Sequence, residues 1–233
     1  MRTFLYWTAV GVLVLVGGWF LVRNEYISIP FVSAKQPSLT REVVFPSDVS
    51  ENAAKGIREK VLMNQTVLKQ NQNDIDAWLD LAIQYKEAKD FKGAQQVWEY
   101  MNDAFPQQDT SAFNLGVLFH QDLKKYERSE ESYREAIRRN PSAPLNYLGL
   151  HELYRYAYKR DTIAAVDILL EGMKALPNEP NLPIALAAYY RDDTKDYKTS
   201  VQYIIIARDL LKASGDVQKV NALDGEIKRL RAL

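Results

Sequence analysis

One spacing of hydrophobic and polar positions recurs four times along the chain. Each copy begins with an apolar residue and has a leucine three positions later. A small residue follows the leucine in three copies, and an aromatic ring stands three positions further on. Residues three and four apart share one face of an α-helix, so the spacing predicts a helix with one buried face. The copies are Trp78, Leu81, Ala82, Tyr85; Ala112, Leu115, Gly116, Phe119; Tyr147, Leu150, His151, Tyr154; and Pro183, Leu186, Ala187, Tyr190.

A second spacing follows each copy and predicts a second helix that pairs with the first. A small residue is followed four positions later by a larger apolar residue, and a proline closes the segment in three copies. Proline ends a helix because it has no amide hydrogen and clashes with the preceding turn. These positions are Ala94, Trp98, Pro106; Ser129, Tyr133, Pro141; Ala165, Leu169, Pro177; and Ser200, Ile204.

The paired spacing resembles the tetratricopeptide repeat (TPR), whose period is about 34 residues. The copies begin at positions 78, 112, 147 and 183, and we expect the extra residues of the later copies to lengthen the turn inside each pair. The resemblance implies an all-α fold, a right-handed α-solenoid of helix pairs in which each pair packs on its neighbours.

The repeats fall at about residues 75–108, 109–143, 144–179 and 180–214, within a TPR domain predicted for 52–233. A helix over 52–70 precedes them. A capping helix over 216–231 follows, because Gly215 can end one helix and Asp216 can begin the next.

Small residues at the third position of the pattern predict close helix–helix contacts. Ala82, Gly116 and Ala187 leave room for a second helix to approach. We expect Gly116 to lie at such a contact. His151 occupies this position in the third copy and puts that packing contact in doubt.

The amino terminus predicts a single membrane-spanning helix. Residues 4–22 carry no charge, and 19 residues at about 1.5 Å each approach the roughly 30 Å hydrocarbon thickness of a bilayer. A cleaved signal peptide is the alternative, with Val32, Ser33 and Ala34 as its cleavage site. The apolar run is longer than a signal core, so we expect an uncleaved anchor over residues 1–23 of a single-pass membrane protein.

Charges around the anchor leave its orientation open. Arg2 precedes it, whereas Arg23, Lys35 and Arg41 follow it, which slightly favours a cytoplasmic repeat domain. Large domains translocate largely regardless of charge. The layout is similar to that of bacterial anchors that hold repeats outside the cytoplasm, and we expect an extracytoplasmic domain here.

Residues 24–51 predict an extended linker that does not pack on the repeats. Pro30, Pro37 and Pro46 fall in this segment together with several serines. Proline and serine favour an extended, semi-rigid spacer over a packed element.

Composition narrows the function. The chain has 30 basic and 30 acidic residues, and nucleic acid binding needs a clustered basic field, so we expect no nucleic acid partner. There is no cysteine, no glycine-rich phosphate loop and no nucleophile elbow. His120 and Glu152 could approach one another from adjacent repeats, but two histidines without cysteine make a poor metal set. We expect no enzyme activity, no metal, no cofactor and no small-molecule substrate.

The TPR resemblance implies a concave groove lined by the first helix of each pair. Family members that clamp a terminal carboxylate use lysine, arginine and asparagine there. The matching positions here hold Leu79, Ile83, Phe113 and Leu145, so we expect no carboxylate clamp. An apolar floor with charges at one edge suits an amphipathic helix or an apolar peptide of a partner protein. The predicted peptide-binding residues are Leu79, Ile83, Phe113, Val117, His120, Leu148, Glu152, Arg155, Ile184, Ala188 and Arg191.

Two functions remain open. The first is a membrane-anchored adaptor that binds a partner protein in the groove. The second is a structural subunit of a membrane or envelope complex, with a groove that residues 52–70, the carboxyl-terminal helix or a neighbouring subunit covers permanently.

Overall fold

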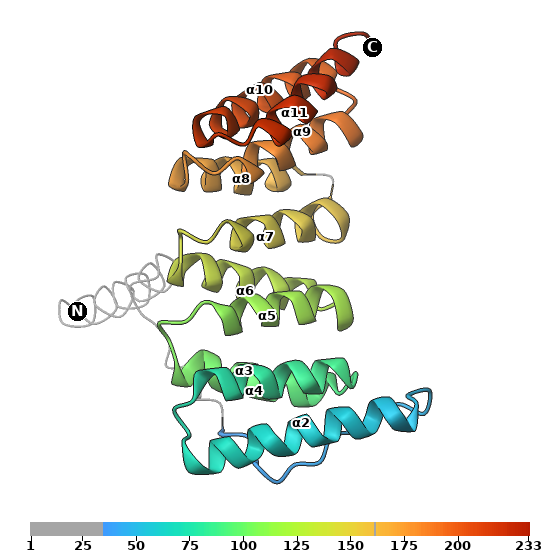
Figure 1. The fold of residues 1–233 in the computed structure, drawn as a ribbon, viewed down its shortest axis with the longest axis vertical. Helices are drawn as coiled ribbons and strands as arrows, with labels where there is room; N and C mark the ends of the chain where they lie inside the picture. The colour runs from blue at the N-terminus through green and yellow to red at the C-terminus, as the bar shows by residue number, and fades with distance from the viewer. Residues whose placement is uncertain (1–34, 161) are drawn as a thin grey trace, which may run out of the picture. The chain divides into compact units, whose positions relative to one another are not determined.

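The computed structural model describes residues 35–160 and 162–233, and every regular element within them is a helix (Figure 1). The predicted anchor and the first part of the predicted linker lie outside the described residues. No helix of the described part is long and apolar enough to cross a membrane. The helices are α2 (Glu51–Gln70), α3 (Ile75–Glu87), α4 (Phe91–Ala104), α5 (Thr110–Val117), the π-helical η1 (Leu118–Asp122), α6 (Tyr126–Arg139), α7 (Pro144–Tyr156), α8 (Ala164–Ala175), α9 (Asn181–Asp192), α10 (Tyr197–Ser214) and α11 (Val217–Leu230).

Residues 36–233 form one compact unit of stacked helix pairs. The pairs are α3 with α4, α5 with η1 and α6, α7 with α8, and α9 with α10. The first helices of adjacent pairs also touch, α5 with α7 and α7 with α9. This arrangement confirms the predicted solenoid of helix pairs.

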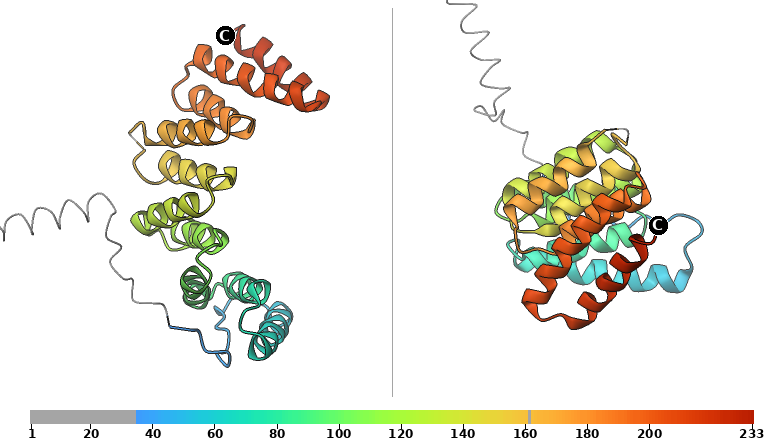
Figure 2. Two further views of the ribbon diagram at one scale, coloured as in Figure 1. Left: turned by 90° about the vertical axis from the view of Figure 1, so that its left-hand side faces the viewer. Right: turned by 90° about the horizontal axis from the view of Figure 1, so that it is seen from above.

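The end helices extend the stack rather than lie across it. α2 packs on α3, and α11 packs on α10. In the left view of Figure 2, α2 and α3 at one end and α11 at the other reach toward the same side of this unit, and α5 and α7 lie on that side of α6 and α8. The first helices therefore line the concave face.

Local chemistry sets where the helices begin and end. The side chains of Asp74, Asp90, Asp196 and Asp216 each accept a backbone N–H of the helix that follows, which satisfies a donor that has no partner within the helix. α4, α6 and α8 each end two positions before a proline, as the prolines predicted; these are Pro106, Pro141 and Pro177. α10 has no such proline and continues to Gly215, which ends it in the left-handed region at φ 81°.

A lysine with positive φ stands in the turn inside every pair. These are Lys89 (59°), Lys124 (54°), Lys159 (59°) and Lys195 (59°). Lys89 is the fourth residue after its repeat's aromatic, whereas the other three are the fifth. The extra residue of the later repeats therefore lies at the end of the first helix, and η1 is the π-turn that holds it in the second repeat. The predicted lengthening of the intra-pair turn is confirmed.

Gly116 lies at the close helix contact that the sequence predicted. A Cβ added to Gly116 would lie 2.7 Å from the Tyr133 ring of α6, and one added to Gly149 would lie 2.6 Å from the same ring. Tyr133 is 2% exposed. The ring therefore fills the space that two glycines leave on neighbouring first helices.

The predicted spacer differs from the structure at residues 39–44, which we name the strap. Leu39 and Val43 pack against the core of α2, α3 and α4. The Arg41 guanidinium donates two hydrogen bonds to the Asp90 carboxylate, at 2.6 and 2.8 Å, and lies 4.7 Å from the Tyr85 ring centre. The strap begins with a turn at Leu39 and Thr40 and has no regular secondary structure after it. The expectation that this segment does not pack is wrong.

Candidate peptide-binding groove

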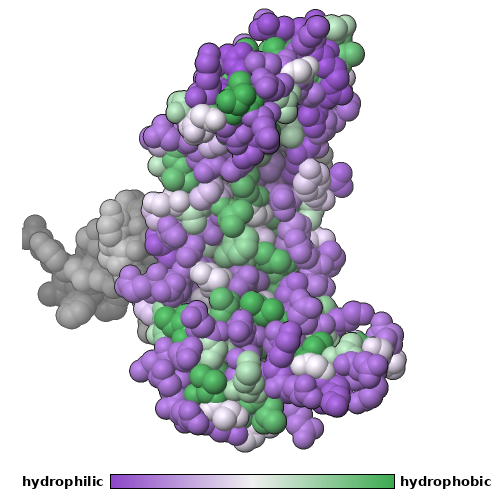
Figure 3. Space-filling model, viewed as in Figure 1, coloured by the Kyte–Doolittle hydropathy of each residue, from purple (hydrophilic) through white to green (hydrophobic). Residues whose placement is uncertain are grey.

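The apolar floor predicted for the groove lies on the first helices, half-buried. Leu79 and Ile83 of α3 pack against the core around α3 and α4. Phe113, Val117 and Leu148 pack in the same way against the core around α7 and α8. Figure 3 shows the concave face, where hydrophobic residues form a broken band along the middle of the stack with hydrophilic residues on both sides.

Two further floor residues lie on α9. Ile184 and Ala188 are half-buried but belong to none of the three hydrophobic clusters of the described chain. Their side chains are therefore the floor positions least tied to the core, and they suit substitution experiments that test the groove without disturbing the fold.

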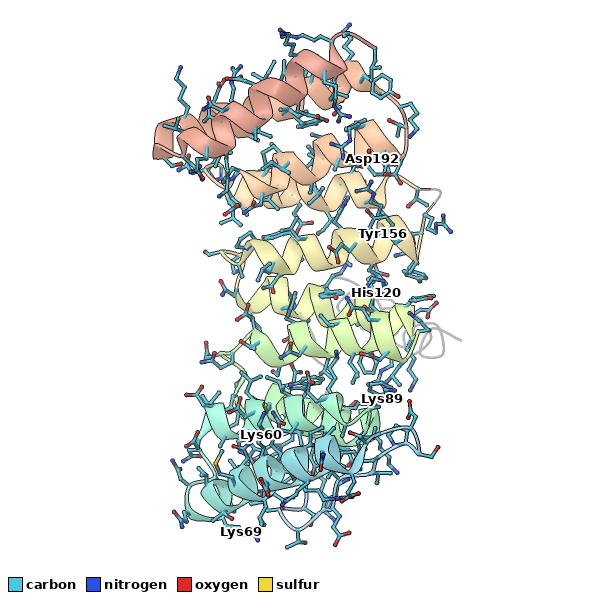
Figure 4. The ribbon with its side chains drawn as sticks, turned by 45° about the vertical axis from the view of Figure 1, so that its right-hand side comes forward. Lys60, Lys69, Lys89, His120, Tyr156 and Asp192 are labelled. Carbon is cyan, nitrogen blue, oxygen red and sulfur yellow. The ribbon has the colours of Figure 1, made fainter. Side chains whose placement is uncertain are left out.

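A basic residue follows the aromatic of every repeat and marks one edge of the groove. These residues are Lys86, His120, Arg155 and Arg191. They stand near the ends of the first helices, and Figure 4 shows Lys89, His120, Tyr156 and Asp192 along one side of the stack. The sequence analysis placed His120, Arg155 and Arg191 in the binding site.

Three of these four basic residues pair with an acid of the next unit. Lys86 Nζ lies 3.5 Å from Asp122 Oδ2, in the second repeat. Arg191 Nη1 lies 3.1 Å from Glu226 Oε1, in α11. We name these contacts, together with the Arg155 contact below, the staples. They tie consecutive units together along the groove edge.

Arg155 is almost fully occupied by contacts within the chain. Its side chain is 8% exposed, forms an ion pair with Asp193 and lies 3.7 Å from Asp192 Oδ2. Its guanidinium also lies 4.8 Å from the Tyr156 ring centre. The charge of Arg155 is therefore already neutralised within the chain, and its place in the binding site stays a prediction.

Arg191 is neutralised as well. Hydrogen bonds to Asp192 and to Glu226 raise the pKa of Arg191 above its usual range. Burial acts in the opposite direction but is outweighed. The Asp192 pKa is lowered by the same contact. The basic and acidic charges at the groove edge therefore cancel in the fourth repeat, and little net charge is left for a ligand.

His120 stands where the staples are interrupted. The acids of two staples, Asp122 and Asp193, each stand three positions after the aromatic of their repeat. In the third repeat this position holds Ala157, so the next unit offers His120 no acid there. His120 has no acid partner in the described structure, and its buried Nδ1 has no hydrogen-bond partner. Burial lowers the pKa of His120, and Lys124 lowers it further.

Glu152 is exposed, and the structure gives it no contact with His120. Within residues 35–160 and 162–233, no group of three or more His, Asp or Glu side chains could hold a metal ion. The arrangement on this face is an apolar floor beside a self-neutralised polar edge. It can bind apolar surface, and no cluster of reactive side chains accompanies it.

The packing of the strap on the first repeat was not predicted from the sequence. Arg41 and Asp90 are 49 positions apart, and Gln65 Nε2 and the Tyr85 hydroxyl both donate to the Arg41 carbonyl, at 2.7 and 3.1 Å. The one available signal was the pair Leu39 and Val43, apolar residues on either side of an arginine.

Comparison with known proteins gives one line of evidence. No family model matches the chain, and no curated protein matches it. Among solved structures, the chain is similar to the crystal structure of MamA, with a TM-score of 0.51 and 15% sequence identity over 72% of this chain and 99% of that chain. Together with the all-helical stack of pairs, this similarity shows that the protein has a TPR-type helical repeat fold.

Proposed function

We propose that the protein is a membrane-tethered adaptor that binds an apolar or amphipathic helical segment of a partner protein along its concave face. The observation that carries the proposal is the run of half-buried apolar side chains on α3, α5, α7 and α9. Apolar side chains gathered on one accessible face of a domain often mark an interaction site.

The staples favour an apolar partner segment over an acidic one. Three of the four basic groups at the groove edge are paired with Asp122, Asp193 and Glu226. An acidic segment would have to displace these acids, whereas an apolar stripe of a helix needs only to cover the floor. An amphipathic helix with apolar residues at i, i+3, i+4 and i+7 matches such a groove.

The tether is the second part of the proposal and rests on residues 4–22. Their uncharged run suits a transmembrane helix, with the repeat domain outside the cytoplasm. Alkaline carbonate extraction tests the tether, since the full chain should stay in the membrane fraction while residues 36–233 alone are released. Protease digestion of intact cells and of opened vesicles tests the side on which the repeats lie.

A fluorescent peptide tests the groove. The probe is a synthetic amphipathic helix with leucine at i, i+3, i+4 and i+7, added to residues 36–233, and anisotropy reports binding. Ile184→Glu should weaken binding at least about tenfold, since a charge on the floor must be desolvated when the helix binds. Gln202→Glu introduces the same charge at an exposed position of α10 and should leave binding unchanged.

Stability separates a free groove from one that is covered within the chain. A free groove predicts that Ile184→Glu and Ala188→Glu keep the unfolding midpoint of the unsubstituted domain. If both variants unfold the domain, the floor is internal core. If the peptide binds all variants equally, the groove is not its site.

A further inference from the structure

The turns inside the second and third pairs carry a basic pair each. Lys124 and Lys125 lie between η1 and α6, and Lys159 and Arg160 follow α7. The Tyr126 and Tyr158 rings, one from each turn, lie 6.2 Å apart, so the two turns are neighbours. Figure 4 shows the same adjacency, with His120 and Tyr156 one above the other on one side of the stack.

Most of these cations are free to meet a ligand. Lys124, Lys125 and Arg160 are exposed, and none has an ionic partner in the part of the chain that the structure describes. Lys159 is the exception, since its Nζ lies 2.7 Å from Glu130 Oε2. The sequence from 122 to 127 and from 155 to 163 has five basic and three acidic residues, whereas the fourth turn, 191–198, has three of each. Two of the five basic residues, Arg155 and Lys159, pair with Asp193 and Glu130, and one of the three acids, Asp122, pairs with Lys86.

Exposed apolar groups flank the turn after α7 on both sides. Ile163, directly before α8, is 72% exposed, and Tyr156 at the end of α7 is 58% exposed. Proteins that lie at the boundary between lipid and water combine such apolar and tyrosine side chains with lysine and arginine. The rings and alkyl groups enter the headgroup layer, and the cations contact the lipid phosphates.

We propose that Lys124, Lys125, Tyr156, Arg160 and Ile163, which we name the turn patch, bind the surface of a bilayer that contains anionic phospholipids. An acidic protein segment would satisfy the three free cations but would leave Ile163 in water, so the lipid surface accounts for more of the patch. The binding is peripheral and reversible, since three cations and one aliphatic side chain give a weak electrostatic attachment.

The turn patch and the floor of the groove use different residues. Four patch residues lie in the turns and Tyr156 is the last residue of α7, whereas the floor residues Val117, Leu148 and Ile184 lie elsewhere on the first helices. A domain that rests on lipid through these turns keeps its concave face open to a partner. The proposal is independent of the anchor, because it concerns residues 36–233 alone.

Vesicle flotation tests the turn patch with residues 36–233, a compact unit that contains all three hydrophobic clusters of the described chain. Vesicles of phosphatidylcholine are compared with vesicles that also contain phosphatidylglycerol. We expect co-flotation with the anionic vesicles only, and a loss as salt rises because exposed charges are screened. The triple variant Lys124→Glu, Lys125→Glu, Ile163→Ser should reduce the bound fraction at least about tenfold.

The matched control is Lys195→Glu with Lys198→Glu, which reverses two charges on the fourth turn and should float like the unsubstituted domain. Equal loss in both variants would mean that overall charge, not the turn patch, drives binding. Binding to neutral vesicles, no binding to either kind, or competition by poly-glutamate with no lipid binding would each overturn the proposal. Unchanged circular dichroism and unfolding midpoints ensure that a loss reflects the surface.

Discussion

His151 Nδ1 lies 2.7 Å from the carbonyl oxygen of Ala165 and joins the two helices of the third repeat. A carbonyl can only accept, so Nδ1 carries the proton and Nε2 is the unprotonated nitrogen of a neutral ring. In the second and fourth repeats the direction is reversed, since Ser129 and Ser200 donate to the carbonyls of Gly116 and Ala187, at 2.7 and 2.8 Å. The third repeat keeps an inter-helix bond although a large residue fills its small position.

This arrangement predicts a loss of stability in mild acid. Burial lowers the pKa of His151, since the residue is only 2% exposed. A proton added to Nε2 would also find no hydrogen-bond acceptor, because Nε2 has no partner in the structure. The unfolded chain takes up a proton near pH 6.5 and the folded chain only at lower pH. Stability therefore falls as pH decreases from about 6.5 through the folded pKa, by at most about 1.4 kcal/mol per pH unit.

Urea unfolding of residues 36–233 between pH 7.5 and 5.5 measures this slope. His151→Ala should reduce it, and His120→Ala should reduce it further, since burial also lowers the pKa of His120. A slope that stays the same in His151→Ala would contradict a buried neutral ring.

Two glycine substitutions should change stability in opposite directions. A Cβ at Gly116 would lie 2.7 Å from the Tyr133 ring, so Gly116→Ala should destabilise the domain by about 1–3 kcal/mol. Gly56, inside α2, has no atom within 4 Å of an added Cβ, so Gly56→Ala should stabilise it by up to about 1 kcal/mol. Chemical unfolding of both variants checks the contrast, and equal signs would mean that the Tyr133 contact is not tight.

The fold was predictable because each repeat carries the same information. The leucine and the aromatic of every copy have the helical spacing of a buried face. In the third copy, for example, Leu150 and Tyr154 are at most 1% exposed. The prolines mark the helix ends independently. A periodic sequence therefore predicts the elements and their neighbours, since each pair stacks on the next.

The polar contacts were not predictable in the same way. Arg155 and Arg191 occupy equivalent positions in their repeats. Their partners, Asp193 and Glu226, depend on the angle at which one unit stacks on the next. Local spacing does not determine that stacking angle. The strap has no period at all, and its attachment depends on Arg41 and Asp90, which are far apart in sequence. The placement of the groove residues as a binding site stays a prediction.

The strap should be held by one buried ion pair. Burial opposes the ionisation of Asp90, but hydrogen bonds from Arg41, the Val44 amide and the Gly93 amide outweigh it and hold its pKa below the usual range. Asp90→Asn keeps an acceptor for the Gly93 amide but leaves Arg41 without its counter-charge. We expect a loss of about 2–4 kcal/mol in the free energy of unfolding.

Asp48→Asn is the matched control for the strap. Asp48 pairs with Lys89 at 3.1 Å, joins the same segment to the same turn and is 67% exposed in its side chain. Surface pairs contribute little, so this variant should unfold like the unsubstituted domain. Proteolysis adds a local readout, because a released strap exposes the Arg41–Glu42 bond to trypsin in Asp90→Asn and not in Asp48→Asn.

The lysines with positive φ predict a gain of stability on substitution by glycine. A side chain in the left-handed region costs about 1–2 kcal/mol, whereas glycine adopts this conformation readily. Lys124 has φ 54° and no ionic partner among residues 35–160 and 162–233, so Lys124→Gly should stabilise the domain by about 0.5–1 kcal/mol. Lys125, its neighbour, has φ −97°, and Lys125→Gly should not stabilise. The two variants remove the same charge from the same turn, so a difference in their unfolding midpoints reports the backbone alone. Equal midpoints would mean that the turn relaxes without glycine.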